Sequence, residues 1–204
     1  MYRVLLSVAL FFCSFSLNAA DAAAGAASYA LCASCHGAQG EGAVGMNGPK
    51  LAGQEQWYLK NQLKAFKSGL RGGAAGDALG AQMRGMAATL VDDAAVDNVI
   101  AHIESLPEAP SPVTVQGDAA KGQALYALCG TCHGVKGEGN PAMNGPRLAG
   151  QNDWYLVSQL NNFKKGLRGA AAGDALGMQM RGMAMTLVDD QAVLDVVSYI
   201  NSLQ

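Results

Sequence analysis

The sequence has no large excess of charge of either sign, few aromatic residues and no apolar run of the length that a membrane-spanning helix needs. Lys and Arg total 14 against 16 Asp and Glu, so the formal net charge is -2. Nucleic-acid binding rests on clustered basic residues, and this balance excludes that class of partner. Aromatic residues make up only 6% while glycines number 26. A dense core of side chains is therefore difficult to build, and the composition predicts that another group fills the interior.

The N-terminus has the pattern of a secretory signal peptide over residues 1–20. Arg3 supplies a short basic region, residues 4–17 are almost wholly apolar, and Asn18-Ala19-Ala20 offers small residues for cleavage. Cleavage after Ala22 is the alternative. A transmembrane anchor would need about 20 apolar residues, so the signal peptide is favoured. Cys13 lies inside this segment and is predicted to be removed with it. The mature protein is expected to be exported to the periplasm without a transmembrane anchor, with peripheral membrane association left open.

The chain contains an internal sequence repeat of two copies. A shift of 97 residues aligns the sequence with itself without a gap, so that Asp21 falls on Asp118 and residues 69–72 fall on 166–169. Roughly two-thirds of the paired positions are identical. Two copies are too few for a solenoid, which indicates tandem domains at 21–106 and 118–204. The linker at 107–117 contains three prolines and predicts a semi-rigid strap that lets the two domains face each other.

Each copy has the pattern of a small all-α domain. Asp21 is a candidate N-cap for a first helix that ends near Gly37. A second helix is predicted over residues 54–68 and a last one from Asp92 to Pro107, with counterparts in the second copy. Their inward-facing residues are Leu59, Leu63, Phe66, Val96, Val99, Ile100 and Ile103, and then Leu156, Leu160, Phe163, Val193, Val196, Val197 and Ile200. Residues 40–53 and 69–85 are predicted to be glycine-rich loops.

Each copy also carries the spacing Cys-x-x-Cys-His, at Cys32, Cys35 and His36 and again at Cys129, Cys132 and His133. Two thiols one helical turn apart can form thioethers with the two vinyl groups of one porphyrin, and the histidine then lies under the iron. The pattern predicts two covalently bound haem c groups.

Three competing roles for the cysteines fit the sequence less well. A thiol redox motif would need a βαβ context, which is missing. A structural zinc site needs four ligands, but each copy offers three, and His102 has Tyr199 as its counterpart. Plain disulfides would leave the histidine unexplained. Haem attachment is therefore the favoured interpretation.

The second axial ligand of each iron is predicted to be methionine, because Met46, Met83 and Met86 recur as Met143, Met180 and Met183. Met46 follows His36 by ten residues and is expected to stay on the histidine side. Met83 and Met86 follow a long segment that is expected to pass around the edge of the haem, so both can reach the face opposite the histidine. Met83 and Met180 are preferred, with the later methionine of each pair packing nearby. An iron with His and Met on its two faces carries electrons and binds no substrate.

These motifs resemble the dihaem cytochrome c4 family, in which two class I cytochrome c domains lie in tandem. The resemblance covers the whole mature chain and rests on the doubled Cys-x-x-Cys-His, the Gly-Pro-x-Leu-Ala-Gly-Gln runs at 48–54 and 145–151, and the doubled Met-x-x-Met. It implies that the ligand methionine lies seven residues before Leu90 or Leu187, which selects Met83 and Met180. It also implies that the carbonyls of Pro49 and Pro146 orient the ligand histidines, and that the domains pack about a pseudo-twofold axis.

Four arginines are candidates either for counter-charges of the haem propionates or for solvated surface residues: Arg71, Arg84, Arg168 and Arg181. Trp57, Tyr58, Trp154 and Tyr155 are interpreted as packing against a haem edge or the other domain. Lys60, Lys64 and Lys67 form a helix face on which copy two has Val157, Asn161 and Lys164, and this asymmetry favours different docking partners for the two domains.

The sequence thus predicts a monomeric periplasmic carrier that is not an enzyme. It would pass single electrons from a quinol-oxidising complex to a terminal oxidase or a similar redox partner. The rival hypothesis is a dihaem enzyme or sensor, such as a peroxidase, with one open haem site. It is disfavoured because both copies keep their methionines. A third alternative is an electron-transfer subunit held permanently in a larger complex.

Overall fold

The computed structural model describes residues 20–203, and these are helical with two isolated backbone bridges. Residues 1–19, which hold nearly all of the predicted signal peptide and Cys13, lie outside the described part. The first half contains α1 (Ala22–His36), α2 (Gln56–Ser68), α3 (Ala78–Ala88) and α4 (Asp93–Ser105). The second half contains α5 (Ala119–His133), α6 (Asp153–Lys164), α7 (Ala175–Ala184) and α8 (Asp190–Asn201). Single 3-10 turns lie at Val44–Met46 and Pro141–Met143. The predicted all-α fold is confirmed.

The helix boundaries follow from local chemistry. The carboxylate of Asp21 accepts hydrogen bonds from the backbone N–H groups of Ala23 and Ala24, as expected of an N-cap. Asp118 caps α5 in the same way. The second helix starts at Gln56, two residues later than expected, and ends at Gly69, which takes a left-handed conformation with φ of 81°.

The predicted loop at 69–85 is wrong in its second half, because α3 begins at Ala78. Its counterpart α7 begins at Ala175. The glycines at 80 and 85 weaken the helix signal, but Asp77 caps the first turn through a hydrogen bond from the N–H of Gly80. The intervening Ala, Leu, Gln and Met residues are strong helix formers and outweigh the glycines.

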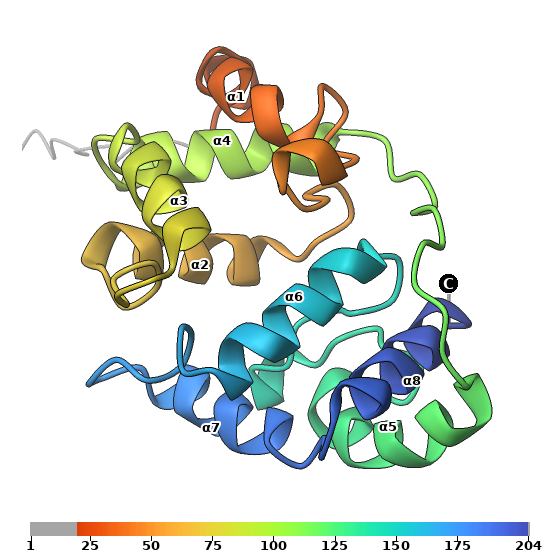
Figure 1. The fold of residues 1–204 in the computed structure, drawn as a ribbon. Coiled ribbons are helices and arrows are strands. Elements are labelled where there is room, and N and C mark those ends of the chain that lie inside the picture. Colours follow the sequence, from red (N-terminus) through yellow and green to blue (C-terminus); the bar gives the residue numbers. More distant parts are fainter. Residues whose placement is uncertain (1–19, 204) are drawn as a thin grey trace, which may run out of the picture.

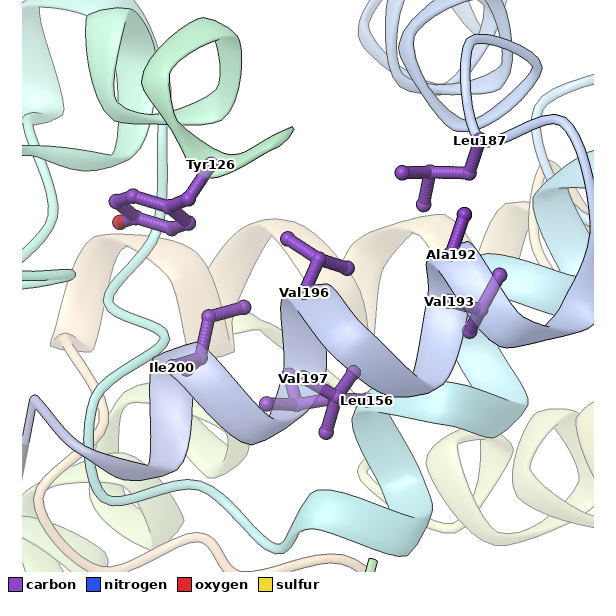
Figure 2. Close-up of a cluster of buried hydrophobic side chains, with 8 residues drawn as sticks. All are labelled: Tyr126, Leu156, Leu187, Ala192, Val193, Val196, Val197 and Ile200. Atoms are coloured by element: carbon purple, nitrogen blue, oxygen red, sulfur yellow. The ribbon is translucent and has the colours of Figure 1, made fainter. Parts of the chain in front are cut away.

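Each half encloses its own core around the last helix. In the second half, α8 presents Val193, Val196, Val197 and Ile200 toward Tyr126 of α5 and Leu156 of α6 (Figure 2). The first half repeats this arrangement, with Val96, Val99, Ile100 and Ile103 on α4. The inward-facing residues predicted for the last helix of each copy are all buried.

The two halves stack with α2 and α6 facing each other across the boundary (Figure 1). The linker runs along one side of the molecule from α4 to α5. It is held in place: the hydroxyl of Ser111 donates to the carbonyl of Gly150 (2.8 Å), and the ammonium of Lys50 donates to the carbonyl of Ala109 (2.5 Å).

Equivalent residues exchange equivalent hydrogen bonds across this boundary. The backbone N–H of Lys50 donates to the side chain of Asn152 (2.7 Å), and that of Arg147 donates to the side chain of Glu55 (2.8 Å). Lys50 and Arg147 are repeat counterparts, and so are Asn152 and Glu55. Reciprocal pairing of this kind is what a twofold relation between two like units produces. The described domains therefore pack about a pseudo-twofold axis.

The crossing of α1 and α4 depends on Gly25. A Cβ at this position would lie 1.9 Å from the carbonyl oxygen of Asn98, so the helices touch through backbone. Gly25→Ala is expected to destabilise the protein by about 1–3 kcal/mol through overpacking. Gly85→Ala on α3 is the matched control, since a Cβ there meets nothing within 4 Å. It should stabilise the protein by about 0.5–1 kcal/mol. Chemical unfolding of the holoprotein followed by circular dichroism measures both; equal midpoints would contradict the crossing argument.

Candidate haem sites

The Cys-x-x-Cys-His segment forms the last turn of α1 and, in the second domain, of α5. Cys32 and Cys35 lie three residues apart on α1, so both side chains project from one face of the helix. Both thiols are half-buried and free, as are those of Cys129 and Cys132. They are placed where thioether bonds to a planar group beside the helix can form.

The adjacent histidines are buried and held in a defined orientation. Nδ1 of His36 lies 2.7 Å from the carbonyl oxygen of Pro49, and Nδ1 of His133 lies 2.7 Å from that of Pro146. A carbonyl can only accept, so Nδ1 carries the proton and Nε2 keeps its lone pair. Burial lowers the pKa of both imidazoles, which favours the neutral, ligating form. The hydrogen bond implied by the family resemblance is confirmed in both domains.

The methionine pair of the first domain lies on α3, away from the histidine in sequence but on the same cavity. Met83 and Met86 are one helical turn apart, both half-buried, and both line the cavity that also contains His36. Met46 lies on the wall of the same cavity but is 51% exposed. Met180 and Met183 are likewise half-buried on α7, whereas Met143 is 49% exposed. The exposed positions of Met46 and Met143 favour the later methionines, and the choice of Met83 over Met86 stays a prediction.

The first domain encloses one large cavity between α1, α2 and α3. Its empty volume is about 1520 Å³ including the open mouth, and its walls carry the two thiols and His36 from α1 and the two thioethers from α3. Apolar side chains such as Leu59, Phe66 and Leu90 cover much of the remaining wall, and polar side chains such as Gln62 and Arg71 complete it. The low aromatic content predicted a core completed by another group, and a flat apolar cofactor fits this space. Within residues 20–203 no group of three or more His, Cys, Asp or Glu side chains is placed to hold a metal ion.

The second domain completes the wall of this cavity. Trp154 and Tyr155 of α6, together with Arg168, line it from across the boundary. This placement agrees with the interpretation of the aromatic pair as packing against a cofactor edge and the other domain. Trp57, the counterpart of Trp154, is half-buried, and its indole N–H is buried without a hydrogen-bond partner.

The four arginines separate into two groups. Arg84 and Arg181 are exposed on α3 and α7. Arg71 and Arg168 lie partly buried at the domain boundary, and their guanidinium carbons stack 4.5 Å from the ring centroids of Phe66 and Phe163.

The three lysines on α2 of the first domain form ion pairs and a hydrogen bond within that domain. Lys60 pairs with Asp97 (2.5 Å), Lys64 pairs with Asp93 (2.8 Å), and Lys67 donates to the carbonyl of Leu90. Exposed pairs of this kind contribute little to stability. They do reduce the free positive charge that the sequence suggested for partner docking.

A cytochrome c family model matches residues 22–107 and again residues 119–204. The chain belongs to the cytochrome c family. Cytochrome c4 of Azotobacter vinelandii is 34% identical over 197 residues, which cover 91% of this chain and 90% of the relative. The thiosulfate dehydrogenase electron acceptor of Stutzerimonas stutzeri is 35% identical over 164 residues, which cover 75% and 72% of the two chains. The crystal structure of reduced recombinant cytochrome c4 from Pseudomonas stutzeri matches with a TM-score of 0.72 at 31% identity, covering 91% of this chain and all of that one.

These similarities place the cytochrome in the dihaem cytochrome c4 family, and the predicted fold of two tandem cytochrome c domains is confirmed. The prediction of two covalently bound haem c groups is confirmed with it. A dihaem cytochrome c of this family transfers electrons.

Sequence reasoning missed the buried polar side chains that join the two domains to each other and to the linker. Lys50, Asn152 and Asp153 are 4%, 5% and 1% exposed, which is unusual for such polar residues. One signal was present: the repeats diverge at all three sites, where Lys50, Glu55 and Gln56 are replaced by Arg147, Asn152 and Asp153.

Proposed function

We propose that this cytochrome is a periplasmic carrier that moves single electrons from a quinol-oxidising complex to a terminal oxidase. The observation that carries the proposal is the composition of the first-domain cavity. It brings an oriented histidine and two methionines to one cavity, so an iron bound there would have candidate ligands of both kinds within the same site. An iron with all positions filled exchanges electrons with little rearrangement and leaves no place for a substrate.

The roles of the residues follow from their positions. Cys32, Cys35, Cys129 and Cys132 would hold the two haems covalently, and His36 and His133 would each bind an iron atom. Met83 and Met180 would supply the second ligand of each iron. When bound, the haem iron supplies the change between ferric and ferrous states. The thioether sulfur of methionine favours the ferrous state, and therefore raises the potential.

The chain around the haem holds it rigid and dry. The carbonyls of Pro49 and Pro146 fix each imidazole ring through its Nδ1–H, which limits motion of the ligand on electron transfer. Buried apolar residues such as Leu59, Phe66 and Leu90 exclude water from the first site. A low-dielectric pocket of this kind keeps the cost of solvent rearrangement small.

The proposal also includes export of the protein by a signal peptide and the limits of its two domains. Residues 1–20 are the signal peptide, 21–106 and 118–204 are the two domains, and 107–117 is the linker. The helices α1–α4 and α5–α8 fall within these domain limits. Among residues 20–203 no helix has the length and apolarity needed to cross a membrane. The working form is a monomer, with the pseudo-twofold relation satisfied within one chain.

The electron donor has a second candidate. Relatives in Stutzerimonas stutzeri and Thiomonas intermedia are named thiosulfate dehydrogenase electron acceptors, at 35% and 32% identity. A sulfur-compound dehydrogenase is therefore the alternative donor, with the haems serving the same purpose.

An optical redox titration of the purified holoprotein, repeated under carbon monoxide, tests the proposal. We expect two low-spin haems, two electrons per chain and no binding of carbon monoxide at native pH. Binding of carbon monoxide by either ferrous haem would reveal an open coordination position. The dihaem enzyme or sensor would then replace the carrier as the favoured function.

A further inference from the structure

Six side chains form a symmetric cluster at the junction of the two domains. Each arginine reaches across the boundary: Arg71 donates to the hydroxyl of Tyr155 (2.8 Å), and Arg168 donates to that of Tyr58 (3.1 Å). We call this set the junction cluster; its members are Tyr58, Gln62, Arg71, Tyr155, Gln159 and Arg168.

The two guanidinium groups share the same two acceptors. Arg71 donates to the amide oxygens of Gln62 (2.7 Å) and Gln159 (2.9 Å). Arg168 donates to the same two oxygens, at 2.9 Å and 3.0 Å. Two like charges are thus joined through neutral bridges, an arrangement that repels itself unless negative charge lies nearby.

No carboxylate of the described chain pairs with either arginine. The ion pairs within residues 20–203 all involve other cations. Asp77 and Asp174, which follow the arginine loops, use a carboxylate oxygen to cap α3 and α7. Within residues 20–203 neither arginine has a directly paired carboxylate, so an anionic group of a bound cofactor can pair with them.

The junction cluster faces the cavity that holds the first haem. All six of its residues line that cavity, three from each domain. The carboxylates that haem brings with it are its propionates, and a guanidinium fork binds a carboxylate through paired, charge-assisted hydrogen bonds. The pseudo-twofold relation gives the second haem the same access to the cluster.

We propose that Arg71 and Arg168 form one cationic site shared by both haems, so that each arginine sets the potential of both. The inference rests on the proposed positions of the haems. A positive charge nearby disfavours the ferric state, which carries one more positive charge than the ferrous state. Because each guanidinium contacts residues of both domains, loss of one charge acts on two irons rather than one. The cluster also stays partly buried, where salt screens it weakly.

The test is Arg71→Gln in the full-length holoprotein, with both midpoint potentials measured by spectroelectrochemistry. Nuclear magnetic resonance of the haem methyl groups assigns each potential to its domain. We expect both potentials to fall by similar amounts, and Arg168→Gln to give the same pattern. Arg71→Lys keeps the positive charge but loses the paired N–H donors of the guanidinium group. Both midpoint potentials of this variant are expected to lie close to those of the unaltered protein, although the junction hydrogen bonds are incomplete.

Arg84→Gln is the matched control, because it removes the same charge from an exposed position of the same domain. It should leave both potentials nearly unchanged. A fall confined to the first haem after Arg71→Gln would overturn the proposal, as would equal shifts from Arg84→Gln. A spectrum without low-spin methionine-ligated haem in the unaltered protein would instead contradict the proposed function. The two failures are therefore distinguishable.

Discussion

The Met180→Ala variant is expected to bind carbon monoxide at its second haem, whereas the unaltered protein is not. Alanine supplies no thioether, so the iron loses the ligand opposite His133 and gains an open position. The potential of that haem should fall by an amount on the order of tenths of a volt, since axial ligands set haem potentials over roughly 0.8 V. Spectroelectrochemistry and the ferrous carbon monoxide spectrum measure both effects. The first haem, in the other domain, should stay closed.

Met183→Ala is the matched control for this assignment. Met183 lies one turn further along α7 and is half-buried like Met180, so its loss removes similar packing. We expect that variant to keep two low-spin haems with both potentials close to their original values. A second haem that remains six-coordinate at an unchanged potential in Met180→Ala would exclude Met180 as the ligand. An open site in Met183→Ala would transfer the role to Met183.

The features that the sequence predicted are those fixed by short-range spacing. The thiols and the imidazole lie within five consecutive residues, so the geometry of one helical turn determines their relation. The helices at Asp93–Ser105 and Asp190–Asn201 are predicted by their apolar periodicity, which the structure buries at Val96, Val99, Val193 and Val196. Both patterns are local and need no knowledge of the tertiary fold.

The features that escaped prediction depend on contacts between distant segments. The glycines of the helix at Ala78–Ala88 lower its local propensity and favour a loop, while its packing against α2 stabilises it in the fold. The role of Arg71 needs Tyr155, which lies 84 residues further along the chain. Nothing near either residue in the sequence indicates the other. The aromatic pairs that include Tyr58 and Tyr155 pointed to a domain contact, but not to the arginines that bind them.

The linker is anchored to the second domain by the carboxylate of Asp153, which is 1% exposed. It accepts hydrogen bonds from the backbone N–H of Thr114, from the hydroxyl of Thr114 (2.6 Å) and from the N–H of Val115 (2.7 Å). Asn201 of α8 and the N–H of Trp154 donate to the same carboxylate. Burial alone would raise the pKa of Asp153, but the hydrogen bonds from Thr114, Val115 and Trp154 outweigh it and lower the pKa.

Asp153→Ala is expected to destabilise the holoprotein by about 2–4 kcal/mol near neutral pH, because each backbone donor of the linker left without a partner costs about 1–3 kcal/mol. Since the pKa of Asp153 is lowered on folding, the carboxylate stabilises the fold fully above about pH 4 and loses this effect as the pH falls further. The gap in unfolding free energy between the two proteins should therefore narrow in acid. Urea unfolding at neutral and acidic pH measures this difference in unfolding free energy.

Gln56→Ala is the matched control, since Gln56 is the exposed repeat counterpart of Asp153 and contacts Glu104 rather than the linker. It should change stability by less than about 0.5 kcal/mol. Equal losses in the two variants would show that the linker is not held by this carboxylate.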